Sequence, residues 1–165
     1  MKNAAALAFF AFVILLSCRP DEEGLQQIDQ VLHIYIDSAK TDMLNNNIPG
    51  AYRSFQVNDV YGITDNAPVS LSLKKDADTI SYLEYVAGAK RMIIDSSALQ
   101  RTYESKLAFA FIKKKNDSTN VTINDTMRIR YSWTPQLFRV ETVYYNNQLQ
   151  YSNAGETPHI VRITK

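Results

Sequence analysis

The chain has 165 residues, with 18 basic and 17 acidic side chains and a formal net charge of +1. This balance excludes the basic excess of a nucleic-acid surface and the acidic excess of a cation store. One cysteine, two histidines and five glycines offer little material for metal or phosphate sites, whereas ten tyrosines and seven phenylalanines favour strands.

The first segment of the chain has the features of an export signal. Lys2 precedes 13 consecutive apolar residues, 4–16. A bilayer-spanning helix needs about 20 residues, so this run is too short to span and has the length of a signal-peptide core. The run ends at Ser17-Cys18, and this short segment resembles a bacterial lipobox. The alternative is a plain N-terminal anchor with an incidental cysteine.

The lipobox resemblance implies that Cys18 carries lipid and that residues 1–17 are removed. Removal of Lys2 leaves 17 basic and 17 acidic side chains, a net charge of zero. A lone cysteine consumed by acyl chains forms no disulfide, so the fold must be held by its core.

Three acids, Asp21, Glu22 and Glu23, follow the cysteine closely. They resemble the acidic export signal of Bacteroidota lipoproteins, which implies an outer-membrane protein that faces the cell exterior. The alternative is a solvated tether, because acidic stretches are commonly disordered. We therefore expect a signal peptide over 1–17, a lipidated tether over 18–30 and a single antiparallel β domain over 31–165.

Alternation of apolar and polar residues with a period of two predicts most of the elements after the tether. In chain order the predicted strands are residues 32–38, 51–63, 69–75, 105–115, 126–133, 137–145, 148–152 and 159–163. Asn146-Asn147 is predicted to form a two-residue hairpin turn between two of them, because asparagine tolerates the left-handed conformation.

Two segments leave alternatives open. Leu25, Ile28 and Leu32 have a spacing that suits a short N-terminal helix or a tether that docks. Residues 80–95 suit either two strands with a bend at Gly88 or a helix. Their tyrosine, valine and isoleucine content favours strands.

Short strands at near-regular spacing predict an all-β fold. We expect an antiparallel β-sandwich, Ig-like or similar, with a barrel as the alternative. The strand at 105–115 is apolar on both faces and is expected to need cover on both. Residues 113–125 are polar and are expected to form an exposed, mobile loop. The predicted core consists of Leu107, Phe109, Phe111, Ile129, Tyr131 and Trp133.

In outline the chain is similar to small Bacteroidota outer-membrane lipoproteins. The lipobox and the segments VSLSLKKDAD (69–78), DTMRIRYS (125–132) and HIVRI (159–163) carry this resemblance. It implies no particular activity.

The residues that catalysis needs are scarce. His33 and His159 are the only imidazoles, both in predicted strands, and no hydrolase, Walker or dinucleotide motif is present. Glu84 could be a buried carboxylate of the catalytic kind, but a strand residue that faces water is the commoner explanation. We therefore expect no enzyme activity, no cofactor and no metal.

Four positions match the pattern D-[ST]-[AILVMT], which resembles the O-glycosylation acceptor of Bacteroidota. The hydroxyl-bearing residues are Ser38, Thr79, Ser118 and Thr126. Asp-Ser and Asp-Thr also mark turns for purely local reasons. Ser118 is the preferred candidate, because it lies in the predicted loop, whereas Thr79 is expected to enter a strand.

Aromatic residues supply the candidate binding surface, namely Tyr131, Trp133, Tyr144 and Tyr145. Such residues anchor interfaces, although core packing is their commoner role. By elimination we expect a surface-exposed binding module of the outer membrane, held there by its lipid, with a glycan or an envelope protein as ligand. The alternatives are a structural envelope lipoprotein and an enzyme of an unrecognised kind.

The lipobox predicts that Cys18→Ser releases the protein from the membrane fraction. The wild-type chain should sediment with membranes and carry acyl chains on Cys18 by mass spectrometry. An unmodified thiol on the mature wild-type chain would contradict this prediction.

Overall fold

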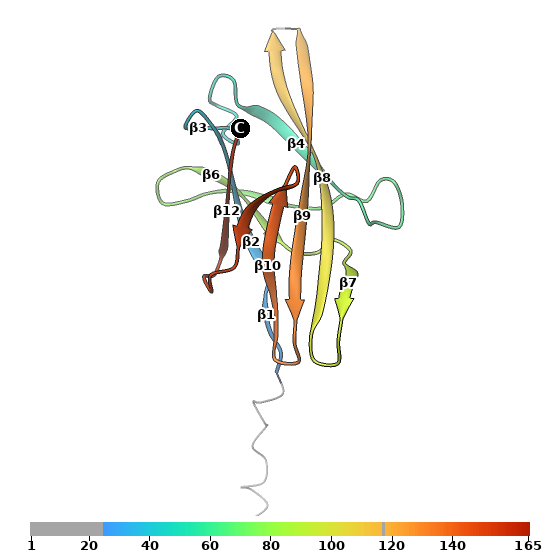
Figure 1. The fold of residues 1–165 in the computed structure, drawn as a ribbon. Coiled ribbons are helices and arrows are strands. Elements are labelled where there is room, and N and C mark those ends of the chain that lie inside the picture. Colours follow the sequence, from blue (N-terminus) through green and yellow to red (C-terminus); the bar gives the residue numbers. More distant parts are fainter. Residues whose placement is uncertain (1–24, 117) are drawn as a thin grey trace, which may run out of the picture.

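The structure is a computed structural model that describes residues 25–116 and 118–165. This part of the chain contains strands and no helix, and hence no helix long and apolar enough to cross a membrane (Figure 1). The strands are β1 (Gln27–Asp29), β2 (Val31–Ser38), β3 (Thr41–Asp42), β4 (Tyr52–Asp59), β5 (Ser72–Lys75), β6 (Ser81–Val86), β7 (Met92–Ser96), β8 (Arg101–Asn116), β9 (Thr119–Trp133), β10 (Leu137–Tyr145), β11 (Gln148–Ser152) and β12 (His159–Thr164).

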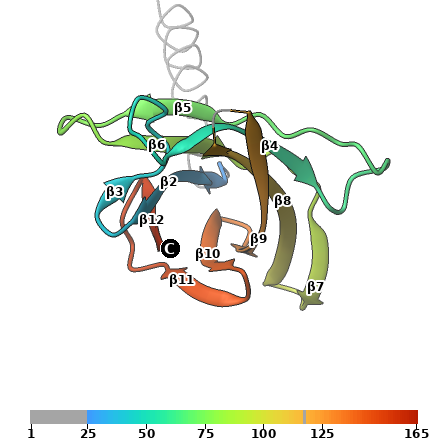
Figure 2. The same ribbon diagram turned by 90° about the horizontal axis from the view of Figure 1, so that it is seen from above.

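The strands form two sheets around one core. The seven-stranded sheet has the order β1-β10-β9-β8-β4, with β11 added to β10 and β7 to β8. The five-stranded sheet has the order β12-β2-β6-β5, with β3 added to β2. Seen from above, the larger sheet curls into a half-barrel and the smaller sheet closes its open side (Figure 2). The predicted all-β fold is thus confirmed.

Two pairs of strands are parallel, in contrast to the antiparallel arrangement of the others. β1 pairs with β10 from Gln27↔Leu137, and β12 pairs with β2 from His159↔Leu32. Each pair joins strands far apart in the sequence, so no hairpin fixes their direction. The sequence holds no local signal for such long-range pairs.

The core forms where the inward-facing residues of both sheets meet. Of the six predicted core residues, Leu107, Phe109, Phe111, Ile129 and Tyr131 are buried. The sixth, Trp133, is half-buried and packs against the core. The regular alternation of buried and half-buried positions along β8 and β9 is the pattern of strands with one face on the core.

The expectation that β8 is covered on both faces is wrong. Leu107, Phe109 and Phe111 face the core, but Ala108 and Ala110 are half-buried on the opposite side. Alanine side chains are small enough to lie on an open sheet face without a covering layer.

Two ambiguous segments are strands. Residues 27–29 form β1 rather than part of a helix, so the predicted tether over 18–30 is docked on the sheet at this point. Residues 80–95 contain β6 and β7, which belong to different sheets. The chain crosses between the sheets near Gly88, where the Tyr85 hydroxyl accepts hydrogen bonds from the N–H groups of Gly88 (3.2 Å) and Ala89 (2.9 Å).

The predicted loop at 113–125 is mostly strand. β8 and β9 continue through it as one long hairpin, with pairs such as Lys113↔Val121 and Phe111↔Ile123. The polar side chains over 114–116 and 118–120 are exposed, as expected. Their backbones, however, pair across the hairpin as neighbouring strands do. Asp117 lies outside the described residues.

The predicted strand over 69–75 is divided between the two sheets. The N–H of Val69 donates to the carbonyl of Val57 (2.9 Å) and so lies on the edge of β4, whereas Ser72–Lys75 form β5 in the other sheet. The chain between them becomes part of the candidate site described below.

We expect Phe109→Ala to lower the free energy of unfolding by about 3–5 kcal/mol, because a buried phenyl ring leaves a cavity. Phe109 is 2% exposed and stacks on Phe111 with a centroid distance of 5.5 Å. The measurement is denaturant unfolding, with Val121→Ala as the control on an exposed part of the same hairpin. A loss below about 1 kcal/mol for Phe109→Ala would place its side chain outside the core.

Candidate ligand-binding face

The register of β8 and β9 places a row of polar and small side chains on the face away from the core. Directly opposite pairs on this face are Ala110↔Asn124, Ala108↔Thr126, Lys106↔Arg128 and Glu104↔Arg130. On the other side of β8, Gln56 of β4 pairs with Ala110 and Asn58 pairs with Ala108. We call this surface of β4, β8, β9 and β10 the outer face.

A groove of about 870 Å³ lies in the outer face above Ala108 and Ala110. Its floor is low because two methyl groups stand where neighbouring strands carry longer side chains. Amide and hydroxyl groups line it, from Gln56, Asn58, Asn66, Asn124, Thr126 and Asn146. We call it the alanine groove. Because amides both donate and accept hydrogen bonds, this rim matches neutral ligands that carry hydroxyl or amide groups.

The segment 65–71 forms one wall of the groove and is held by Asn58. The Asn58 Oδ1 accepts a hydrogen bond from the N–H of Ala67 (2.6 Å), and its Nδ2 donates to the carbonyl of Asp65 (3.2 Å). Gly62 is required in the preceding turn, because a Cβ there would stand 2.3 Å from the Cβ of Ala67.

The opposite side of the groove is fixed by Asn146 in the turn between β10 and β11. Asn146 has a φ of +47°, as the predicted hairpin turn requires. Its Oδ1 accepts from the N–H of Thr126 (2.8 Å), and its Nδ2 donates to Asp125 (2.6 Å). This side chain therefore supports the rim, while Gln56 and Asn124 are exposed above the floor.

Asp125 lines the groove, but its carboxylate is already engaged. It pairs with the Lys165 ammonium, which lies above the rings of Tyr52, Phe111 and Tyr145 at 5.0–5.4 Å from their centroids. Burial alone would raise the pKa of Asp125, but hydrogen bonds from Lys165 and Asn146 outweigh it and hold the pKa below its usual value. The Asp125 carboxylate is thus engaged, and the other carboxylate that lines the groove, that of Asp65, is exposed in the wall segment.

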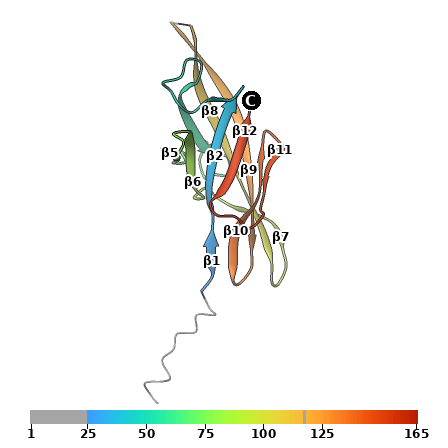
Figure 3. The same cartoon turned by 90° about the vertical axis from the view of Figure 1, so that its left-hand side faces the viewer.

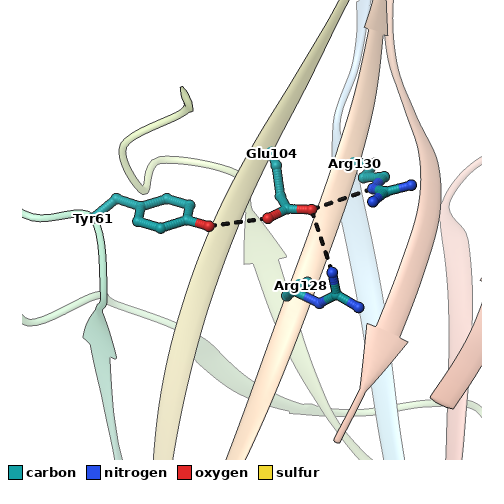
Figure 4. Close-up of polar contacts among 4 residues, drawn as sticks. All are labelled: Tyr61, Glu104, Arg128 and Arg130. Carbon is teal, nitrogen blue, oxygen red and sulfur yellow. Dashed lines mark hydrogen bonds and ion pairs between the residues drawn. The ribbon is translucent and has the colours of Figure 1, made fainter. Parts of the chain in front are cut away.

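A second polar cluster follows the groove along β8 and β9 (Figure 4). Glu104, 7% exposed, accepts a hydrogen bond from the Tyr61 hydroxyl (3.0 Å) and another from the Arg130 Nε (3.2 Å). Arg128 adds an ion pair at 3.7 Å. A buried carboxylate is costly unless paired, so these partners compensate for its burial.

Glu104 also holds residues 60–61, which lead into the wall of the groove, against β8. Tyr61 follows β4, and the nearby Val60 N–H donates to the carbonyl of Lys106 (2.9 Å). The pKa of Tyr61 is raised by its burial and, in addition, by its hydrogen bond to Glu104. Both contacts hold residues 60–61 on β8 and so set where the wall begins.

Tyr144 orients the two arginines from the β10 side. The guanidinium carbons of Arg128 and Arg130 lie 5.0 and 5.4 Å from its ring centroid. This geometry is that of cation–π contacts, which stabilise flat, fixed guanidinium groups. The arginine side chains remain 28% and 38% exposed, so they can still present N–H donors beside the groove.

The four aromatic binding candidates do not form one platform. Tyr131 and Tyr145 belong to the core, with 0% and 4% exposure, and their selection as binding residues is wrong because strand alternation turns them inward. Trp133 is half-buried near the far end of β9, where the Arg101 guanidinium lies 4.7 Å from its ring centroid. Tyr144 alone lies on the outer face.

The glycosylation candidates lie in four different environments. Ser118 is exposed in the turn between β8 and β9, and Thr79 is exposed in a turn with a φ of +65°. The expectation that Thr79 enters a strand is thus wrong. Ser38 is half-buried and its hydroxyl donates to the carbonyl of Lys165 (2.8 Å). Thr126 is half-buried within β9 and lines the alanine groove.

Glu84 lies on the outer side of the five-stranded sheet and pairs with cations. Its carboxylate is 2.6 Å from Lys74 and 3.5 Å from the His33 ring. The hydrogen bond from Lys74 is the main cause that lowers its pKa. Glu84 is therefore a strand residue toward solvent, as the commoner explanation expected. Cys18, Asp21, Glu22 and Glu23 lie outside the described residues.

His159 contacts residues of two other strands, and no sequence pattern predicts these contacts. It is fully buried, its Nδ1 is 2.7 Å from the Tyr151 hydroxyl, and its Nε2 is 3.1 Å from Asp29. The Nε2 contact has the distance of an ion pair but not the alignment of a hydrogen bond. Since Asp29 is in β1, the imidazole joins three strands. Among the described residues, no three histidine, cysteine or acidic side chains gather as metal ligands would.

Comparisons of the chain with known protein families, with curated proteins and with solved structures find no match.

We expect Glu104→Ala to lower the free energy of unfolding by about 1.5–3 kcal/mol, the usual range for hydrogen bonds to charged groups. The change removes the acceptor of Tyr61 and Arg130. Amide hydrogen exchange should also become faster at Val60 and across 65–71, because the hydrogen bond between Tyr61 and Glu104 no longer holds the wall. Glu141→Ala, on a half-buried glutamate of β10, is the control. Unchanged exchange over these residues in Glu104→Ala would show that the wall does not depend on Glu104.

Proposed function

We propose that this chain is a lipid-anchored binding module that faces the cell exterior, and that the alanine groove binds a neutral glycan. Two sets of residues support this proposal. The lipobox at Cys18 and the acids at 21–23 support the location, and the amide-rimmed groove supports the activity. The groove is the observation that carries the function.

A glycan suits this groove for three reasons. Sugar hydroxyls both donate and accept hydrogen bonds, as the amides of Gln56, Asn66 and Asn124 do. The alanine methyls offer an apolar floor on which a sugar ring can lie. Of the two carboxylates among the lining residues, Asp125 is neutralised by Lys165, which leaves Asp65 on the wall beside the amides.

The outer faces of the sheets favour a binding module over a purely structural envelope protein. A structural partner would need a broad apolar patch. The outer face instead carries amides, arginines and Tyr144, and the opposite sheet carries Glu84, Lys74 and the Tyr82 ring, which stacks on Tyr35 at 5.3 Å.

We expect Ala108→Trp to abolish glycan binding without loss of stability, because its side chain fills the groove and not the core. The measurement is binding of the purified lipoprotein to an array of bacterial surface glycans. Gln56→Ala with Asn124→Ala should weaken binding at least tenfold, the equivalent of about 1.4 kcal/mol.

The matched control is Ile160→Trp, on the exposed side of β12 in the other sheet. Equal glycan binding by wild type, Ala108→Trp and Ile160→Trp would move the site away from the groove. Binding to peptides but to no glycan would assign the groove to a protein partner.

A further inference from the structure

Exposed apolar side chains gather at the end of the molecule where the described chain begins. Leu25, 81% exposed, precedes β1, and Leu99, 73% exposed, lies in the turn between β7 and β8. Ile28 in β1 and Ile94 in β7 are also exposed. Figures 1 and 3 show that β1, the β7–β8 turn and the β9–β10 turn lie at one end, opposite the tip of the β8–β9 hairpin.

Hydrogen bonds and register join these turns. The N–H of Gln27 donates to the carbonyl of Gln136 (2.8 Å) in the β9–β10 turn, and Arg101 at the start of β8 pairs with Trp133 at the end of β9. We call the group of Leu25, Ile28, Ile94, Leu99, Arg101 and Trp133 the basal end.

The basal end also has a tryptophan–arginine pair. Trp133 is half-buried and the Arg101 guanidinium lies 4.7 Å from its ring centroid. Tryptophan is enriched at the level of lipid headgroups, and arginine can rest its stem on apolar surface while its charge reaches water or phosphate. Exposed leucine and isoleucine beside such a pair form a surface suited to the membrane interface.

The short chain between Cys18 and the basal end indicates that the basal end lies against a membrane. Only seven residue steps separate Cys18 from Leu25. Even fully extended, they span at most roughly 25 Å. Strand β1 is fixed to the domain by its pairing with β10 and by the Asp29–His159 contact at 3.1 Å. A lipid on Cys18 would therefore hold Leu25, at the basal end, within roughly 25 Å of the bilayer.

We propose that the basal end docks on the surface of the membrane that holds the lipid anchor, with Leu25 and Leu99 inserted among the headgroups. The inference rests on the lipid anchor of the proposed function. In this orientation β8 rises from the bilayer, and Ala108, seven residues beyond Arg101, stands roughly 24 Å above it. The alanine groove is then held clear of the lipid at a fixed height.

The test uses the single tryptophan of the chain, Trp133, as the reporter. The full lipoprotein, purified from its own host, is reconstituted in phosphatidylethanolamine–phosphatidylglycerol vesicles with and without nitroxide-labelled headgroups. We expect the labelled lipid to quench Trp133 in the wild type. The double variant Leu25→Glu, Leu99→Glu should lose this quenching while it still floats with the vesicles.

The control is Val121→Glu with Leu149→Glu, two exposed apolar residues distant from the basal end along β9 and β11, which should be quenched like the wild type. Flotation without quenching in the wild type, or equal quenching in both double variants, would overturn docking and leave the anchor intact. Failure to float would overturn the anchor and docking together. A dimer cross-linked through β7, without quenching of Trp133, would show that the basal end binds a second copy of the chain and not the membrane.

Discussion

The alignment of β8 with β9 is the constraint on which the rest of this molecule depends. Side chains alternate between faces with a period of two, so a slip of one residue would exchange core and solvent along the whole hairpin. In the observed register the large residues Leu107, Phe109 and Phe111 fill the core, while Ala108 and Ala110 face outward. The same pattern that builds the core therefore also leaves the groove.

Polar contacts on the outer face then determine the shape of that groove. The side-chain amides of Asn58 and Asn146 form hydrogen bonds that hold the wall and the rim of the groove. Glu104 accepts a hydrogen bond from Tyr61 and so holds the chain that leads into the wall. These contacts hold the groove in one shape, and a preformed shape would lower the entropic cost of the glycan binding proposed above. The remaining amides of Gln56 and Asn124 are exposed over the groove.

The N-terminal strand links this face to the proposed membrane anchor. β1 adds to the edge of β10, and the buried His159 ring lies between Asp29 and Tyr151. The chain that leaves the domain toward Cys18 thus starts from a rigid strand. Height and direction of the groove would be set by the length of β8 rather than by a flexible linker.

Sequence patterns predicted the strands with one buried face well and the long-range arrangement poorly. Alternation predicts β2, β9, β10 and the core around Phe109, because a strand with one exposed and one buried face has alternating polar and apolar residues. The apolar residues on both faces of 105–115 predict two-sided burial, but Ala108 and Ala110 instead form the floor of the groove. No local pattern indicates the contacts of Tyr61 with Glu104 or of His159 with Asp29, which join segments distant in the chain.

The position at which a glycan binds is the decisive property of the alanine groove. Hydrogen exchange of the lipoprotein is measured with and without neutral oligosaccharides released from the host's own surface polysaccharide. Binding in the alanine groove should add protection at 56–58, 66–70, 108–110 and 124–126, all around the groove. Protection confined to β2, β6 and β12, in the other sheet, would contradict it.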